Sequence, residues 1–278
     1  MIKLLPEEHA ALASYIYAIC AVSLDQSKAY LMEGRLGLLV EETGCGSFRC
    51  LVERAKSEPG RALERRIVDA ITTNETLFFR DTAPFDLLRH KIVPELIDRR
   101  ARTGASWIRI WSAACSTGQE IYSIAILLKE LLGDPDRYGV RLVGTDISDQ
   151  AVARASRGLY NATEIARGLS EPLRDEYFAQ TRNGWQIRDE IRAMAVFKRQ
   201  NLMGDLSALG RFDVIFCRNV AIYFSEADKI SLFRRIERAL EPNGYLVIGA
   251  MESLNGVGPQ FESKRHLRSV FYQVKGSR

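Results

Sequence analysis

Residues 108–128 constrain the fold more than any other part of this chain of 278 residues. Ile108 and Ile110 alternate with a basic residue up to Trp111, which is the period of a β-strand. Residues 112–118 then carry no side chain larger than Cys or Thr, and residues 119–128 place apolar side chains at helical spacing. A strand, a turn of small residues and a helix form the unit with which α/β proteins open a ligand pocket at the carboxyl end of a strand. A tight turn without a ligand is the alternative for this stretch taken alone.

The same turn indicates which ligands fit it. It lacks the Gly-x-Gly-x-x-Gly spacing of dinucleotide sites and the lysine of a nucleoside-triphosphate loop. Gly118 is its one glycine, and Glu120 follows just inside the helix. A polyanion is therefore a poor ligand for this turn, and a zwitterionic or cationic nucleoside is a better one.

Strands and helices alternate along the rest of the chain after Trp107. This alternation predicts an α/β fold with a doubly wound, mostly parallel sheet, which an antiparallel pair finishes. The predicted strands are 108–112, 140–146, 196–199, 212–217, 245–250 and 270–274, and the predicted helices are 120–132, 148–156 and 225–240. Residues 158–195 break the rhythm, and Arg182-Asn183-Gly184 is a tight-turn signal there, so we expect a small insertion that carries a β-hairpin.

The first hundred residues are predicted to be helical. Helices are expected at 7–21, from an N-cap at Asp25 to 43, at 48–56 and at 61–71. We therefore expect a helical N-terminal domain at 1–72, a linker with a connecting helix at 73–106, and a nucleoside-binding domain at 107–278 with its insertion at about 158–195. Basic residues are frequent in this part, and a solvated face of a helical bundle explains them without any partner: they are Lys28, Arg35, Arg49, Arg54, Lys56, Arg61, Arg65 and Arg66.

Composition narrows the functional classes. A net charge of +4 is too small for a nucleic-acid-binding surface. No apolar run is long enough to span a bilayer, and the N-terminus is no signal peptide, so we expect a cytoplasmic protein that is not inserted in a membrane. Five cysteines without a Cys-x-x-Cys spacing and three scattered histidines predict no metal site. Cys115 and Cys217 follow strands and are expected to be buried thiols rather than nucleophiles.

Polar residues follow several of the predicted strands. Asp146 ends the second strand, where a carboxylate can accept both hydroxyls of a ribose; a helix N-cap or a surface turn is the alternative. Asn201 and Leu202 follow a later strand and fit an adenine, although an ordinary turn explains them equally well. Arg218 follows the most apolar strand, and Tyr223 comes shortly after it, either in the site or as a core aromatic.

Four stretches together resemble the CheR family, the chemotaxis-receptor glutamate methyltransferases that use S-adenosyl-L-methionine. They are Thr-Thr-Asn-Glu-Thr-Leu-Phe-Phe-Arg at 72–80, Trp-Ser-Ala-Ala-Cys-Ser-Thr-Gly-Gln-Glu-Ile-Tyr-Ser at 111–123, Asp146, and Phe-Cys-Arg-Asn-Val-Ala-Ile-Tyr-Phe at 216–224. The resemblance covers nearly the whole chain and implies the methyltransferase fold that binds S-adenosylmethionine.

The resemblance also implies residue roles. Arg80 and Tyr223 would be the catalytic residues, Arg80 facing the site of methyl transfer and Tyr223 lying near the methyl group. The implied cofactor-binding residues are Asn74, Thr76, Arg80, Glu120, Asp146, Asn201, Leu202, Arg218 and Asn219. Two departures stand out: Gln119-Glu120-Ile121 replaces the family's acidic-acidic-Pro, and residues 249–253 lack the His-Ser that usually precedes Glu252, which leaves the role of that loop open.

The implied function is methyl transfer to glutamate carboxylates of receptors, with S-adenosyl-L-homocysteine as the product. The implied partner is the cytoplasmic helical domain of a chemotaxis-type receptor, and we expect a monomer. Some relatives capture a receptor's C-terminal pentapeptide with a longer hairpin, and the short turn at 181–185 predicts that this chain has no such tether. The alternative is a catalytically weak regulatory module of a signalling complex. Methylation of a small molecule or of nucleic acid is disfavoured by the helical N-terminal region and the modest charge.

Overall fold

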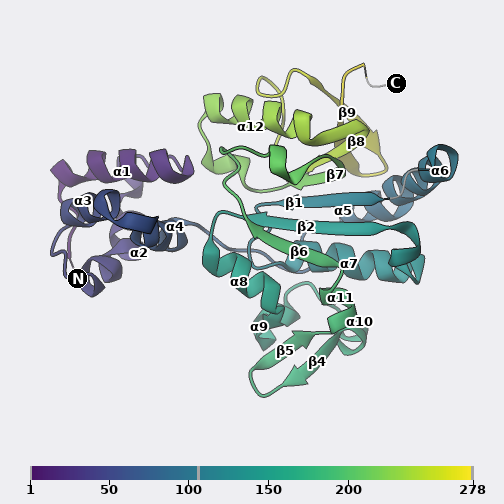
Figure 1. Ribbon diagram of the computed structural model, residues 1–278, viewed down its shortest axis with the longest axis horizontal. Helices are drawn as coiled ribbons and strands as arrows, with labels where there is room; N and C mark the ends of the chain where they lie inside the picture. The colour runs from purple at the N-terminus through teal and green to yellow at the C-terminus, as the bar shows by residue number, and fades with distance from the viewer. Residues whose placement is uncertain (1, 105–106, 277–278) are drawn as a thin grey trace.

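The N-terminal helices form a lobe with its own apolar core in this computed structural model, which describes residues 2–104 and 107–276. The helices are α1 (Pro6–Cys20), α2 (Ala29–Glu42), α3 (Phe48–Ser57) and α4 (Ala62–Ile71), with short 3₁₀ turns η1 (Gln26–Lys28) and η2 (Pro59–Arg61). The predicted cap at Asp25 accepts the backbone N–H of Ser27 at 3.0 Å and starts the turn that leads into α2. Figure 1 shows this lobe beside the larger α/β body.

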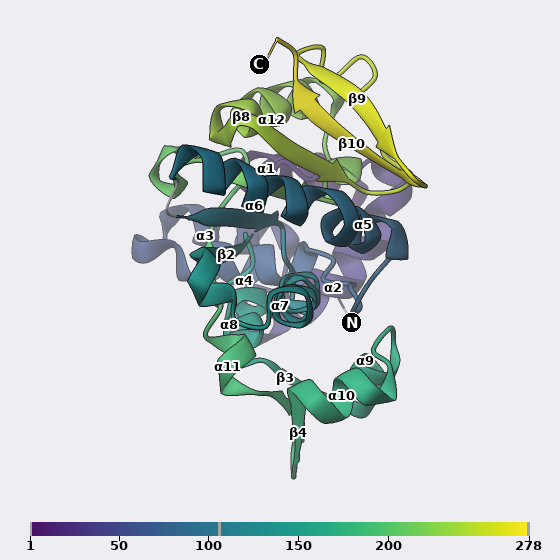
Figure 2. The ribbon, with the colours of Figure 1, turned by 90° about the vertical axis from the view of Figure 1, so that its right-hand side faces the viewer.

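A continuous helical segment connects the lobe to the sheet. It comprises α5 (Thr82–Leu87), the π-helical turn η3 (Leu88–Ile92) and α6 (Val93–Thr103). Its apolar side chains, such as Leu88 and Val93, belong to the same core cluster as the strands. Figure 2 shows this segment running across one face of the sheet.

Seven strands form the main sheet, in the order β6-β2-β1-β7-β8-β10-β9. They are β1 (Ile108–Ala113), β2 (Val140–Asp146), β6 (Ala195–Arg199), β7 (Phe212–Cys217), β8 (Leu240–Ile248), β9 (Phe261–His266) and β10 (Ser269–Val274). The first five are parallel, and β10 runs antiparallel to both β8 and β9. The predicted doubly wound sheet with a terminal antiparallel pair is confirmed. Strand β9 was not predicted, because an edge strand of sequence Phe-Glu-Ser-Lys-Arg-His has almost no buried side chains.

Helices cover both faces of this sheet. Ile108 and Ile110 of β1 face the cluster that contains helix α7 (Gln119–Leu132), whereas Trp111 faces the cluster that contains α12 (Glu226–Ala239). Helix α8 (Asp149–Arg157) follows β2 and contacts β2 and β6. The strand order reverses at β1, because β2 lies on one side of it and β7 on the other. Such a switch point leaves a crevice outside the carboxyl ends of the strands, where ligands of open α/β sheets bind.

The predicted insertion is a small sheet of its own, which Figure 1 shows below the main sheet. Its strands are β3 (Leu159–Tyr160), β4 (Phe178–Thr181) and β5 (Gly184–Ile187), and its helices are α9 (Ala162–Ala166), α10 (Glu171–Tyr177) and α11 (Asp189–Arg192). Thr181 pairs with Gly184, so the predicted tight turn at Arg182-Asn183 is confirmed. Three further 3₁₀ turns are η4 (Pro135–Tyr138), η5 (Ser207–Leu209) and η6 (Ala221–Tyr223).

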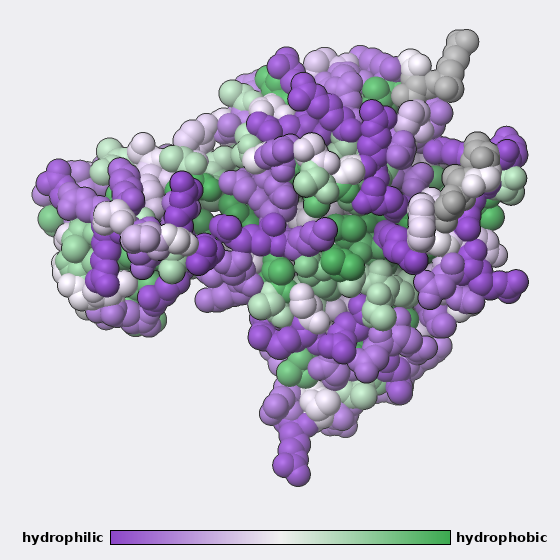
Figure 3. Space-filling model, in the orientation of Figure 1, coloured by the Kyte–Doolittle hydropathy of each residue, from purple (hydrophilic) through white to green (hydrophobic). Residues whose placement is uncertain are grey.

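Polar contacts fasten the helical lobe to the α/β body. The Ser148 hydroxyl donates to Asp69 of α4 at 2.7 Å, and Arg65 of α4 lies 3.4 Å from Asp149. On the other side the Tyr17 hydroxyl donates to Asp228 of α12 at 2.7 Å. The space-filling view of Figure 3 shows a hollow between the lower part of the lobe and the body. Within the described ranges, no helix is long and apolar enough to cross a membrane.

Candidate active site

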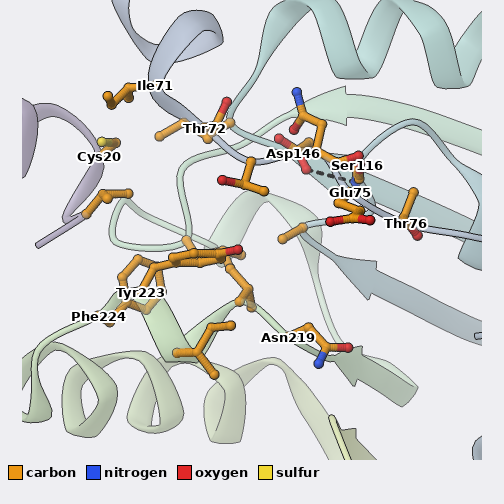
Figure 4. Close-up of a pocket in the computed structure, with 18 of the residues that line it drawn as sticks. Cys20, Ile71, Thr72, Glu75, Thr76, Ser116, Asp146, Asn219, Tyr223 and Phe224 are labelled. Carbon is orange, nitrogen blue, oxygen red and sulfur yellow. Dashed lines mark hydrogen bonds between the residues drawn. The ribbon is translucent and has the colours of Figure 1, made fainter. Parts of the chain in front are cut away.

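A cleft of about 270 Å³ lies between the helical lobe and the carboxyl ends of the parallel strands. The chain segments that follow β1, β2, β6 and β7 all line it, as do the end of α1 and the start of α2. It also brings together every site residue predicted from the sequence: Asn74, Thr76, Arg80, Glu120, Asp146, Asn201, Leu202, Arg218, Asn219 and Tyr223. Figure 4 shows Tyr223 and Phe224 across this cleft from Thr72 and Asp146.

The Asp146 carboxylate is fixed by the backbone of two neighbouring segments. Its Oδ2 accepts the N–H of Ser116 at 2.8 Å (the dashed line in Figure 4), and its Oδ1 accepts the N–H of Ser148 at 3.0 Å. The side chain is almost fully buried. Burial raises the pKa of Asp146 above its ordinary value, and the two N–H groups offset part of that rise. The carboxylate is therefore rigid, poorly solvated and ready to accept hydroxyl donors.

The turn after β1 has an unusual backbone that the small residues make possible. Ala114 and Ser116 both have positive φ, 59° and 51°, and so does Gly118 at 96°. A Cβ on Gly118 would lie 3.0 Å from the Cβ of Ala155, so the helix packs closely at this point. The Ser116 hydroxyl donates to the Asn74 carbonyl at 2.9 Å, which ties the turn to the segment before Arg80.

Glu120 and Arg218 form a buried ion pair in the cleft wall. Nη1 of Arg218 donates to Oε2 of Glu120 at 2.8 Å, while the Ser112 hydroxyl donates to Oε1 at 2.7 Å. Nη2 of Arg218 also donates to the Arg80 carbonyl and to the Asp81 carboxylate, each at 2.8 Å. Only 2% of the Arg218 side chain is exposed, so its charge is compensated by protein groups rather than by water.

Arg80 extends from the segment that Arg218 holds. Phe79 and Asp81, on either side of it, both have positive φ, 48° and 60°. The Phe79 N–H donates to the Ser123 hydroxyl at 2.9 Å, which fixes the other side of this strained turn. The Arg80 guanidinium has a long contact of 3.4 Å to the Glu75 carbonyl, and no carboxylate within the described ranges forms an ion pair with it. Arg80 is thus a half-buried cation in the cleft that is available to an anion.

Asn201 has a second role that the sequence did not indicate. Its Nδ2 donates to the Ile19 carbonyl of α1 at 3.1 Å, and its Oδ1 accepts the Met203 N–H at 2.9 Å. The side chain therefore joins the two parts of the protein at the cleft. Its expected contact with an adenine, together with that of the buried Leu202, stays a prediction.

The helical lobe supplies a wall that sequence reasoning missed. Val22, Ser23 and Leu24, just after α1, line the cleft, and the Ser23 N–H donates to the Tyr223 carbonyl at 3.2 Å. Lys28 and Arg35 also line it. Arg35 donates to the Ile71 carbonyl at 2.6 Å, so it fixes the connection between the lobe and the Arg80 segment. No motif marks these positions, because their role arises only when the lobe meets the sheet.

Cys115, which lines the cleft, and Cys217, which ends β7, are both buried, as predicted. Cys115 and Cys217 are 2% and 0% exposed. Burial, followed by nearby carboxylates, raises the pKa of both thiols well above the ordinary range. Burial therefore favours the neutral thiol at both positions, where the side chains pack among their neighbours.

Comparison with known families decides the class. Residues 74–269 match the CheR methyltransferase SAM binding domain, and residues 7–72 match the CheR methyltransferase all-alpha domain. The chain belongs to the CheR methyltransferase family. Among curated relatives, chemotaxis protein methyltransferase Cher2 of Pseudomonas putida is 40% identical over 266 residues, covering 94% of this chain and 95% of the relative. Chemotaxis protein methyltransferase 1 of Pseudomonas aeruginosa is 39% identical over 266 residues, again covering 94% and 95%.

The lining of the cleft fits the cofactor of this family, S-adenosylmethionine. Asp146 offers acceptors for ribose hydroxyls, Glu120 offers carboxylate oxygens although Arg218 compensates its charge, and Leu202 is apolar. Gly118 is the one glycine of the turn, so the turn is not a glycine-rich phosphate-binding loop. This agrees with S-adenosylmethionine, which carries no phosphate. The donor and acceptor chemistry of this CheR cleft therefore agrees with a nucleoside that carries a positive charge.

Proposed function

We propose that this protein transfers the methyl group of S-adenosylmethionine to glutamate side-chain carboxylates of chemotaxis-type receptors. Membership of the CheR family, with relatives named chemotaxis protein methyltransferase, supports the reaction and the pathway. The Arg80 cation lines the cofactor cleft and has no ion pair among the residues that the structure describes, and this is the single observation that most favours a carboxylate substrate.

The cofactor-binding residues are part of the same proposal. Asp146 accepts hydroxyl donors with a carboxylate that Ser116 and Ser148 hold in place. Glu120 and Arg218 hold each other and the Arg80 segment. Asn74, Thr76, Arg80, Asn201, Leu202 and Asn219 complete the proposed set, and all of them line the cleft.

A carboxylate acceptor needs no general base. When bound, S-adenosylmethionine supplies a sulfonium methyl group, and a carboxylate oxygen is already a nucleophile at neutral pH. The chain's work is to remove water from the carboxylate and to orient it. Arg80 compensates for the hydration that the glutamate carboxylate loses in the cleft. Its charge-assisted hydrogen bonds also orient that carboxylate.

Tyr223 is proposed to shape the opposite side of the cleft. The residue is 37% exposed, and Figure 4 shows its ring facing the open space. The Ser23 contact at its backbone holds it against the helical lobe. It donates a hydrogen bond or packs against the acceptor, and it takes no proton in the reaction.

The partner is proposed to be the helical cytoplasmic domain of a receptor, bound by a monomer in the cytoplasm and without a C-terminal pentapeptide tether. Membranes that contain such receptors test the proposal when they are incubated with the protein and cofactor labelled in its methyl group. Label should appear on the receptor, and receptors whose candidate glutamates are changed to alanine should receive none. Label on those altered receptors equal to that on the unaltered ones would refute glutamate as the acceptor.

A further inference from the structure

Glu252 lies in the loop after β8, and it organises the turn after the neighbouring strand β7. Its Oε2 accepts the backbone N–H of Asn219 at 2.7 Å and the backbone N–H of Gly249 at 2.8 Å. Strands β7 and β8 are parallel neighbours, with Cys217 opposite Ile248. One carboxylate oxygen therefore fastens the ends of two adjacent strands at the edge of the cleft.

The turn that Glu252 holds is strained and close to the site. Asn219 has a φ of 57°, a left-handed conformation that asparagine tolerates better than most residues. Arg218 and Asn219 line the cleft, whereas Glu252 does not. Glu252 therefore reaches the site only through the backbone that it holds.

Gly249 is required by this arrangement. A Cβ at this position would lie 2.5 Å from Oε2 of Glu252 and 2.9 Å from Nδ2 of Asn219. The backbone can approach the carboxylate closely only because that Cβ is absent. The Glu252 N–H donates back to the Gly249 carbonyl at 2.9 Å, so the loop closes on itself around the carboxylate.

The bonding of Glu252 is also one-sided. Oε1 is buried and has no hydrogen-bond partner within the described ranges, whereas Oε2 accepts two N–H groups. Both N–H groups need an acceptor oxygen at the position of Oε2, and the length of the Glu252 side chain sets that position.

We propose that Glu252 is a positioning residue for methyl transfer, which fixes the Arg218–Asn219 turn by holding the N–H groups of Asn219 and Gly249. The inference rests on the proposed cofactor contacts of Arg218 and Asn219. It gives a role to the loop at 249–253, which the sequence left open.

Two substitutions separate the effect of the length of the Glu252 side chain from the effect of its charge. Glu252→Gln keeps the length of the side chain and an oxygen that accepts both N–H groups, but it removes the charge. Glu252→Asp keeps the charge but withdraws the carboxylate by one methylene. Met251→Ala is the matched control, because Met251 is the preceding residue and is 95% exposed.

The readouts are the affinity for S-adenosylhomocysteine by calorimetry, hydrogen–deuterium exchange at the Asn219 amide, and the melting temperature of each purified full-length variant. We expect Glu252→Gln to keep affinity within about threefold and to keep the amide protected. Glu252→Asp should lose about tenfold in affinity or more, with faster exchange at Asn219, since the hydrogen bonds to a charged acceptor are lost. Met251→Ala should match the wild type.

Three results would overturn the inference. One is a Glu252→Asp variant with wild-type affinity and exchange. Another is greater loss of affinity in the Gln variant than in the Asp variant, which would make the charge decisive. The third is a lower melting temperature with unchanged affinity in both variants, which is the signature of a purely structural residue. None of these readouts uses a receptor. A failure of the positioning role of Glu252 can therefore be distinguished from a failure of the proposed receptor methylation.

Discussion

Nη1 of Arg218 and Oε2 of Glu120 lie 2.8 Å apart in the wall of the cleft, although 98 residues separate them in the chain. The pair joins the end of β7 to the first turn of α7, and the same guanidinium holds the Asp81 carboxylate and the Arg80 carbonyl. Glu120 and Arg218, two of the proposed cofactor contacts, and the backbone of the proposed catalytic Arg80 are therefore parts of one hydrogen-bonded unit.

Replacing Arg218 with methionine should affect stability and binding together. Arg218→Met leaves the carboxylate of Glu120 with Ser112 as its one hydrogen-bond donor within the described ranges. Breaking one partner of a buried ion pair costs about 3 kcal/mol of unfolding free energy. Denaturant unfolding measures that loss, and calorimetry should show weaker cofactor binding. Arg141→Lys, at an exposed arginine stacked on Trp107, is the control and should change neither quantity. Wild-type stability of Arg218→Met would contradict the importance of the unit.

Removing the side chain of Arg80 should abolish methyl transfer, whereas cofactor binding, in which Arg80 is one proposed contact among several, should weaken only in part. The substrate carboxylate loses the cation that compensates its desolvation, whereas Arg218 still holds the backbone of residue 80. Labelled-methyl transfer to receptor and calorimetry with the cofactor give the two numbers. Arg167→Ala is the control, because Arg167 pairs with Glu75 on the same segment and is about half exposed. Turnover of Arg80→Ala near that of the wild type would disprove the role.

Asp146 should make cofactor affinity depend on pH. Its pKa is raised from the ordinary 3.8, mainly by burial, so the carboxyl takes up its proton at a higher pH than a solvent-exposed aspartate. Hydroxyl donors favour the ionised form, and affinity should therefore fall as pH falls through the raised pKa, as calorimetry from neutral to acidic pH will show. In the free protein the sign is opposite. The stability that Asp146 contributes is present below the unfolded-state pKa and is lost as pH rises through the raised folded-state pKa.

Two variants calibrate that experiment. Asp146→Ala should weaken cofactor binding at neutral pH and should flatten the pH dependence that this carboxyl causes. Asp136→Asn is the control, because the Asp136 side chain is 88% exposed, and it should leave the affinity profile unchanged. An Asp146→Ala variant with wild-type affinity would remove Asp146 from the site.

The hairpin of the insertion should not capture a receptor's C-terminal pentapeptide. Strands β4 and β5 have four residues each, and a turn of two residues joins them, which leaves little edge for strand addition. Calorimetry with the pentapeptide should show no heat of binding, and binding of S-adenosylhomocysteine to the same preparation shows that the protein is competent. Tight pentapeptide binding would refute the prediction.

The apolar pattern of the sequence predicted those site residues that lie at the ends of strands. Asp146 ends one apolar strand and Arg218 follows another. Because the carboxyl ends of parallel strands lie at one edge of the sheet, strand order places both residues at the same cleft. Likewise, the small residues before Gly118 predicted a close turn, and the Cβ contacts at that glycine explain why. The domain boundaries at 72 and 106 stay a prediction.

Contacts between distant segments could not be predicted. The Asn201 side-chain amide donates a hydrogen bond to the Ile19 carbonyl, 182 positions away, and the Ser23 N–H donates one to the Tyr223 carbonyl. Neither the asparagine nor the serine lies in a sequence pattern that indicates such a contact. The sequence placed Asp81 in a linker. Its hydrogen bond from Arg218 depends on the positive φ values of Phe79 and Asp81. Strand β9 was missed because Phe261 is its one apolar residue, so it has no apolar alternation.

Treatment of the methylated receptor with mild base distinguishes a glutamate methyl ester from other methylated products. Receptor-containing membranes are incubated with the protein and with cofactor labelled in its methyl group, and the recovered receptor is then treated with mild base. A glutamate methyl ester hydrolyses under these conditions, so the account predicts that the label leaves as methanol and that Arg80→Ala transfers none. Label that stays on the receptor after base, or no label on the receptor at all, would contradict the account.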